Sequence, residues 1–78
     1  MNTKHFKDST VKQISVSIDG FPNRVLLTRF FSERNWSVRG EIYGELRVEM
    51  HDGAKTMFQR ATALKLAEQY IRTGREFL

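Results

Sequence analysis

Cysteine is absent from the 78-residue chain, which excludes a disulfide scaffold, a thiolate zinc site and a cysteine nucleophile. Long hydrophobic runs are absent too. The longest purely apolar run is Val25-Leu26-Leu27, far short of the roughly 20 residues of a membrane-spanning helix. The first residues include lysines, but no apolar stretch follows them, so we expect no secretion signal. These absences predict a soluble, cytoplasmic protein.

The composition is that of a small folded domain. Apolar residues make up 40% of the chain and charged residues 28%, which favours folding over disorder. Thirteen lysines and arginines against nine acidic residues give a net charge of +4, which favours a polyanionic partner. We expect a single domain over residues 1–78, with a flexible basic tail over 1–10, a folded core over 11–74 and a C-terminal tail over 75–78.

Alternation of apolar and polar side chains predicts the strands. Residues 11–18 place isoleucine and valine on one face and polar side chains on the other, as in a half-buried strand. Residues 19–23 gather Asp, Gly, Pro and Asn and predict a turn. Residues 24–31 are apolar on both parities, as in a central strand. Residues 32–35 form the next turn.

The strongest alternation runs from Trp36 to Met50, with apolar residues at even positions and polar residues at odd positions. A straight strand of this length would extend roughly 50 Å, so we expect it to bend at Gly40 and Gly44, as bulges or as a tight loop near Tyr43-Gly44. Both glycines lie on the apolar face, where a missing side chain lets another element approach closely.

The C-terminal third predicts a hairpin, a short strand and a helix. Asp52-Gly53 is a two-residue hairpin signal. If the helical pattern of the last third is extended backward beyond residue 60, apolar side chains fall on the polar side of the helix. We therefore expect a short strand over about 54–58 and a helix over about 60–73. Gly74 suits the helix C-terminus and Arg72 suits its dipole.

The expected fold is α+β, an antiparallel meander of three or four strands with one C-terminal helix packed on one face. The expected core residues of the sheet are Ile14, Val16, Ile18, Leu26 or Leu27, Trp36, Val38, Ile42, Leu46 and Val48, and those of the helix are Leu64, Ala67, Tyr70 and Ile71.

Catalysis is not expected. Glu41, Glu45 and Glu49 share a strand face, but neighbours on it lie roughly 13 Å apart, which suits an ionic outer face with Arg39 and Arg47 better than paired acid and base groups. The two histidines of the chain, at 5 and 51, resemble surface histidines more than ligands, since a metal site needs several rigidly held donors. We therefore predict no enzyme activity, no cofactor and no metal.

A basic and aromatic surface predicts nucleic-acid binding. Four arginines recur every five residues among three aromatic residues, and such a mixture suits phosphate contact and base stacking. We expect Arg24 and Arg34 to project from turns, and Arg29 and Arg39 from the outer sheet face. Phe30, Phe31 and Trp36 are either stacking rings or core. The residues expected to contact nucleic acid are Arg24, Arg29, Arg34, Arg39, Lys65, Arg72 and Arg75.

A sheet followed by one helix, with Asp52-Gly53 before it, is similar over about residues 46–70 to the small three-stranded DNA-binding domains of phage-type integrases. The resemblance implies a DNA-binding role for the sheet. However, this chain has glutamates at strand positions where such a domain would carry cations.

A protein partner is the alternative. In this reading the chain is a small adaptor or inhibitor, of the kind encoded by phages and mobile elements, that docks through its mixed-charge sheet face or a sheet edge. The interface residues would be Tyr43, Arg47, Phe58 and Phe77. The apolar end of the chain, Phe77-Leu78, either folds back onto the sheet or forms a homodimer contact.

Overall fold

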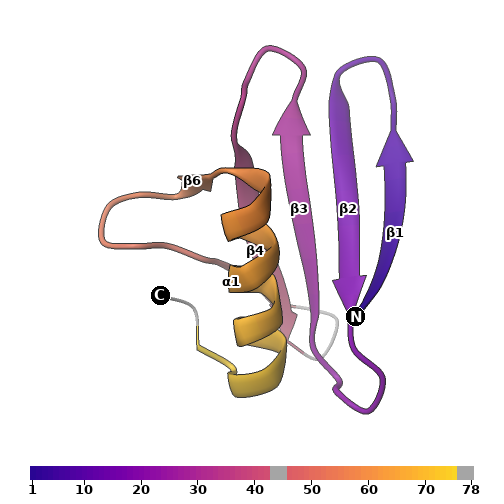
Figure 1. Ribbon diagram of the computed structural model, residues 1–78, viewed down its shortest axis with the longest axis vertical. Helices are drawn as coiled ribbons and strands as arrows, with labels where there is room; N and C mark the ends of the chain where they lie inside the picture. Colours follow the sequence, from indigo (N-terminus) through magenta and orange to yellow (C-terminus); the bar gives the residue numbers. More distant parts are fainter. Residues whose placement is uncertain (43–45, 76–78) are drawn as a thin grey trace.

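The computed structural model describes residues 1–42 and 46–75, without the side chains of residues 42, 46 and 47. The described chain forms an antiparallel sheet with one helix on one of its faces (Figure 1), so the predicted α+β meander is confirmed. It has more strands than the three or four expected. The elements are β1 (Asn2–Lys7), β2 (Val11–Ser17), β3 (Arg24–Phe30), β4 (Trp36–Ile42), β5 (Leu46–Glu49), β6 (Met57–Phe58) and α1 (Arg60–Thr73).

Strand β1 occupies residues that we expected to form a flexible tail, and that expectation is wrong. The strand pairs with β2 over its whole length, from Asn2 opposite Ser17 to Lys7 opposite Lys12. All six of its residues are exposed, so β1 has no apolar face and no alternation that a sequence pattern would reveal. Backbone hydrogen bonds to β2 stabilise it instead.

The turn between β1 and β2 is organised by one carboxylate. An Asp8 side-chain oxygen accepts hydrogen bonds from the backbone N–H of Thr10 at 2.7 Å and of Val11 at 2.9 Å, and from the Thr10 hydroxyl at 3.0 Å. The backbone hydrogen bond from Thr10, then that from Val11, holds the pKa of Asp8 below its ordinary value. The ionised carboxylate therefore fixes the turn that brings β1 beside β2.

Replacing Asp8 by alanine is expected to lower the Tm by a few degrees at neutral pH, because the turn loses three hydrogen bonds. A depressed folded-state pKa stabilises the fold fully above the unfolded pKa of about 3.9, and this contribution is lost as the pH falls through the lower folded pKa. Thermal melts of both proteins from neutral to strongly acidic pH should therefore converge at the acidic end. Ser9→Ala, in the same turn, is the control, and a Tm difference that does not depend on pH would contradict this role of Asp8.

The long alternating segment is two strands rather than one. Ile42 is paired with Leu46 and Arg39 with Glu49, so β4 and β5 are antiparallel. The tight loop expected near Tyr43-Gly44 lies outside the described residues. Even positions face the helix in β4, where Trp36, Val38 and Gly40 are buried. The pairing of Gly40 with Val48 keeps even positions on the same face in β5.

The strand expected over about 54–58 is shorter and pairs differently. Gly53 has a positive φ of 60°, but the loop residues are Gly53 and Ala54, since Asp52 and Lys55 exchange two backbone hydrogen bonds of 2.9 and 3.0 Å across them. The chain then leaves the sheet and returns as β6, which pairs with the beginning of β4, Phe58 lying opposite Trp36. The return buries Phe58, which is 1% exposed.

Helix α1 lies over β4 (Figure 1) and also contacts β3 and β2, and its bounds are those predicted. Its last turn ends at Gly74, whose φ of 74° is left-handed and whose N–H donates to the Tyr70 carbonyl at 2.7 Å. None of the described helices is long and apolar enough to cross a membrane.

The core lies between α1 and the sheet. Of the two alternatives expected in the core, Leu26 and Leu27, Leu27 is the buried residue. Ile18, Val48 and Leu64, which were also expected in the core, are only partly buried at its margin. The side chains of Ile42 and Leu46 lie outside the description. The buried core residues are Ile14, Val16, Val25, Leu27, Trp36, Val38, Met50, Phe58, Ala63, Leu66, Ala67, Tyr70 and Ile71.

Candidate nucleic-acid interface

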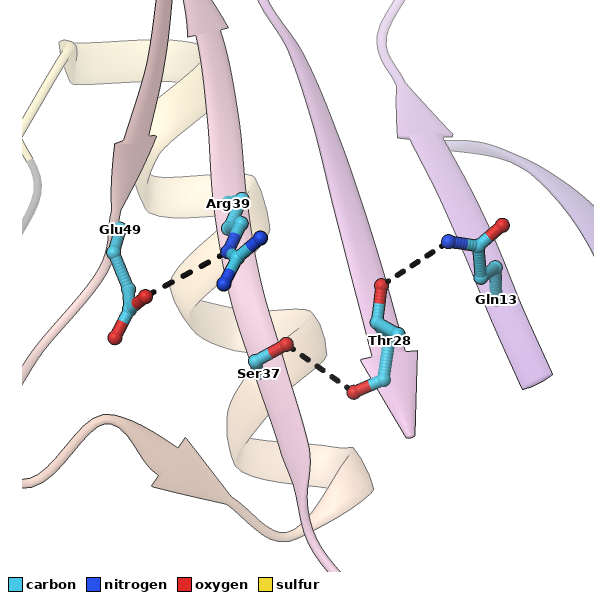
Figure 2. Close-up of polar contacts among 5 residues, drawn as sticks. All are labelled: Gln13, Thr28, Ser37, Arg39 and Glu49. Carbon is cyan, nitrogen blue, oxygen red and sulfur yellow. Dashed lines mark hydrogen bonds and ion pairs between the residues drawn. The ribbon is translucent and has the colours of Figure 1, made fainter. Parts of the chain in front are cut away.

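The seven cations predicted to contact nucleic acid do not lie on one surface. Arg24 and Arg39 project from the outer face of the sheet, which we define as the face opposite α1. Their cross-strand neighbours are Glu41 and Leu26. Arg39 also forms an ion pair with Glu49 at 3.6 Å (Figure 2). The ionic outer face expected from the sequence is present, and its acidic partners make this end of the face a poor phosphate site.

Arg29 lies on the helix side of the sheet, and its expected position beside Arg39 on the outer face is wrong. Val25, Leu27 and Arg29 share one face of β3, and the first two are buried beneath α1. The guanidinium of Arg29 lies 5.6 Å from the centre of the Trp36 ring and donates to the Glu33 carbonyl at 2.8 Å. Arg29 therefore closes one end of the core while its charge stays near the surface.

The remaining predicted cations are scattered over exposed positions. Arg34 lies in the turn between β3 and β4, and Lys65 lies on the solvent side of α1. Arg72 pairs with Glu68 at 3.1 Å and lies 5.6 Å from the Phe21 ring. Arg75 is exposed just beyond the helix. These residues do not form a single continuous basic surface.

A different set of cations forms a row across three strands. Lys7 lies directly opposite Lys12, and Lys12 lies directly opposite Arg29. Directly opposed residues of antiparallel strands share a face and lie about 4.5–5.5 Å apart at Cβ, so all three project on the helix side, beyond the part of the sheet that α1 covers. We call these residues the cationic row.

Two members of the row, Lys7 and Lys12, line a cavity of about 200 Å³ between the sheet and the beginning of α1, and Arg29 lies next to Lys12 outside its lining. Arg60, the first residue of the helix, faces the lysines across it. We call this cavity the basic cleft; its charged and aromatic lining consists of His5, Phe6, Lys7, Lys12, Trp36 and Arg60. The beginning of α1, the end of β1 and the start of β2 all lie at the same end of the molecule (Figure 1).

The basic cleft has little negative charge to balance it. Lys7, Lys12 and Arg60 form no ion pair with any carboxylate of residues 1–42 and 46–75. The ionised Asp8 carboxylate of the adjacent turn is the acidic group nearest in sequence to Lys7 and Lys12; it accepts hydrogen bonds from Thr10 and Val11 and forms no ion pair with these cations. The first turn of α1 contains no acidic residue, so the partial positive charge at the helix N-terminus adds to the same field.

Like charges directly opposite one another destabilise a sheet. The cationic row places two such pairs side by side, and Lys12, at its centre, is half-buried. The repulsion between these cations opposes folding, and no carboxylate of the described residues forms an ion pair with any of the three. An external anion that bridges the row would relieve the repulsion, so the arrangement is chemically suited to phosphate or carboxylate groups.

The sequence left open whether Phe30, Phe31 and Trp36 are exposed stacking rings or core residues, and the structure places them in different environments. Trp36 is 6% exposed and belongs to the core, whereas Phe30 is 50% and Phe31 42% exposed. The Lys7 ammonium lies 5.9 Å from the centre of the Phe31 ring. Cations and exposed rings are therefore adjacent at this end of the molecule. The arginine spacing had indicated Phe31 as a candidate stacking ring but had not indicated Lys7.

The residues expected to form a protein interface do not gather either. Phe58 is a core residue, so its expected place on the outer face is wrong. Tyr43 and Phe77 lie outside the described residues. Arg47 lies opposite Glu41 in the sheet, and its side chain is not described.

The two histidines are separate, His5 on β1 and His51 in the segment after β5, where the His51 Nδ1 lies 3.1 Å from the Gly53 carbonyl oxygen. In the described part of the chain, no three histidine or acidic side chains gather into a group that would hold a metal ion.

Sequence reasoning missed Lys7, Lys12 and Arg60 for two reasons. Lys7 was assigned to a tail, and the register that aligns it with Lys12 depends on the Asp8 turn. The signal available in the sequence was Asp8-Ser9-Thr10, which favours a turn of the Asx type immediately before the alternating segment 11–18. Comparisons with models of protein families, with curated proteins and with solved structures find no match to this chain.

Proposed function

We propose that the protein is a small, non-enzymatic nucleic-acid-binding protein, and that the phosphate backbone binds in the basic cleft. The observation that carries this proposal is the cationic row facing Arg60 across the cleft. Lys7, Lys12 and Arg60 line a space of about 200 Å³, and Arg29 lies beside it, directly opposite Lys12. None of the four forms an ion pair with a carboxylate of the described residues.

Phosphate is a better fit to this cleft than a single carboxylate ligand. Arg29 and Arg60 offer planar donor groups, and Lys7 and Lys12 offer point charges, the two kinds of donor that bind phosphate oxygens. The cations extend across three strands and one helix rather than converging on a single point. A ligand with repeated negative charges, such as a nucleic-acid backbone, satisfies such an array better than one isolated anion.

Binding is expected to weaken steeply with salt. If all four cations contact phosphates of a single strand, the logarithm of the binding constant should fall with the logarithm of the salt concentration with a slope of about −3. Fluorescence anisotropy of labelled DNA and RNA oligonucleotides, single-stranded and duplex, at several salt concentrations measures this slope. Absence of binding to every oligonucleotide at low salt would refute the proposal.

The unpaired edge of β1 supports a protein partner as the second candidate. All six residues of β1 are exposed, and among residues 1–42 and 46–75 the strand pairs with β2 alone, so one side of its backbone is available to an added strand. Lys4 and Lys7 would favour an acidic strand there. Such binding would depend less on salt than phosphate binding does, because backbone hydrogen bonds would dominate it.

A further inference from the structure

The outer face of the sheet carries two exposed aromatic rings near the end that holds the basic cleft. Phe6 of β1 is 47% exposed and Phe30 of β3 is 50% exposed. Phe6 lies opposite Gln13 and Phe30 lies opposite Val11, with both partners on β2. The helix lies on the other side of the sheet (Figure 1), so neither ring is covered by α1.

A polar row lies beside these rings. Gln13, Thr28 and Ser37 are cross-strand neighbours on β2, β3 and β4. The Gln13 amide donates to the Thr28 hydroxyl at 3.4 Å, and the Ser37 hydroxyl donates to the Thr28 carbonyl at 3.3 Å (Figure 2). These long hydrogen bonds leave the amide and the hydroxyls capacity for further donors and acceptors. A second cavity, of about 260 Å³, is lined by this row together with Phe30 and Arg39.

Phe6 connects the outer face with the basic cleft. It lines the cleft, yet its register opposite Gln13 places it on the outer face, because β1 is the edge of the sheet. The Lys4 ammonium lies 5.7 Å from the centre of the Phe6 ring. A polyanion that leaves the cleft therefore meets a ring and a cation at the edge.

We propose that the ligand is a single-stranded nucleic acid whose backbone lies in the basic cleft and whose bases pass over the β1 edge and stack on Phe6 and Phe30. This inference rests on the proposed function and specifies its ligand class. Exposed rings bind unpaired bases of any sequence because every base has a π-face, whereas the bases of a duplex are stacked inside it. The polar row is placed to donate and accept hydrogen bonds at the edge of a stacked base.

The test compares two strands of equal charge. One is a thymidine strand of about ten nucleotides, and the other is an abasic strand with the same number of phosphates. The wild-type protein should bind the thymidine strand about tenfold more tightly or better, because each stacked base strengthens binding about fivefold or more. Phe30→Ala should lower this preference about fivefold or more, with the contribution of Phe6 remaining, and leave the affinity for the abasic strand unchanged.

Phe21→Ala is the matched control, because Phe21 is an exposed ring in the turn between β2 and β3, at the opposite end of the sheet from Phe30. It should keep the full preference. Thermal melts of the Phe30→Ala variant should match those of the wild type, since half of the ring is already exposed.

Each outcome separates the inference from the proposed function. Equal binding of the two strands by the wild-type protein, or an unchanged preference in Phe30→Ala, overturns the stacking path and leaves phosphate binding in the cleft intact. Tighter binding of a duplex than of a single strand at equal phosphate number overturns it as well. Failure to bind any strand at low salt overturns both proposals.

Discussion

Replacing Gly40 by valine is expected to lower the free energy of unfolding by about 3 kcal/mol or more. A Cβ at this position would lie 2.4 Å from Tyr70 Cε2, 2.6 Å from Tyr70 Cζ and 2.8 Å from Met50 Cε. Tyr70 is 2% exposed and Met50 is fully buried, so the ring has no open space to enter without moving α1. Because a domain of this size is marginally stable, most of the variant should be unfolded at room temperature.

Urea denaturation followed by tryptophan fluorescence measures this effect, since Trp36 is buried in the same core. Ser37→Val is the control: it places the same side chain three residues away on β4, facing away from the helix, and should change stability by less than about 1 kcal/mol. Gly40→Ala combined with Tyr70→Leu should be less destabilised than the sum of the two single changes. A stable Gly40→Val variant would show that α1 does not approach β4 this closely.

Reversing the charge of Lys12 is expected to weaken nucleic-acid binding about 100-fold at low salt, because one phosphate partner is lost and a repulsive charge is introduced. The same substitution, Lys12→Glu, is not expected to destabilise the fold. The new glutamate would lie between Lys7 and Arg29, and two repulsive cross-strand pairs would become attractive. The Tm should therefore stay level or rise while binding is lost, a combination that unfolding cannot produce.

Lys65→Glu is the matched control, with the same change of net charge on the solvent side of α1, outside the basic cleft. Its effect on affinity should be threefold or less, the size of a long-range field effect. Anisotropy titrations and thermal melts on the same samples give both quantities. Equal losses of affinity in the two variants would show that net charge, rather than the cationic row, determines binding.

The elements with a periodic pattern were predictable from the sequence. The alternation of apolar and polar residues predicted β2 and the buried face of β4 and β5. The apolar arc between Ala61 and Ile71 predicted the helix. Both patterns arise because burial on one face of a strand or helix imposes its period on the sequence. Strand β1 was not predictable in this way, since none of its side chains is buried. Phe58 was misplaced because its burial depends on β6 returning to β4 across a segment that leaves the sheet.

The candidate site was less predictable than the fold, because it depends on register. Arg29 and Arg39 are both odd-numbered, but odd positions face the helix in β3 and face away from it in β4, since the turn between Phe30 and Trp36 changes the parity. The mixed apolar pattern of β3 hides this change. Lys7, Lys12 and Arg29 are far apart in the sequence, and cross-strand pairing brings them together.

The strand order β1-β2-β3-β4-β5 has a kinetic consequence. Each of these strands pairs with the one that precedes it in the chain, so the sheet assembles by closing short loops, at small entropic cost for each step. Only β6 and α1 must return to strands formed much earlier. Such a low contact order favours rapid folding for a sheet-rich protein, with the half-built sheet holding its uncovered apolar face until the final third of the chain docks on it.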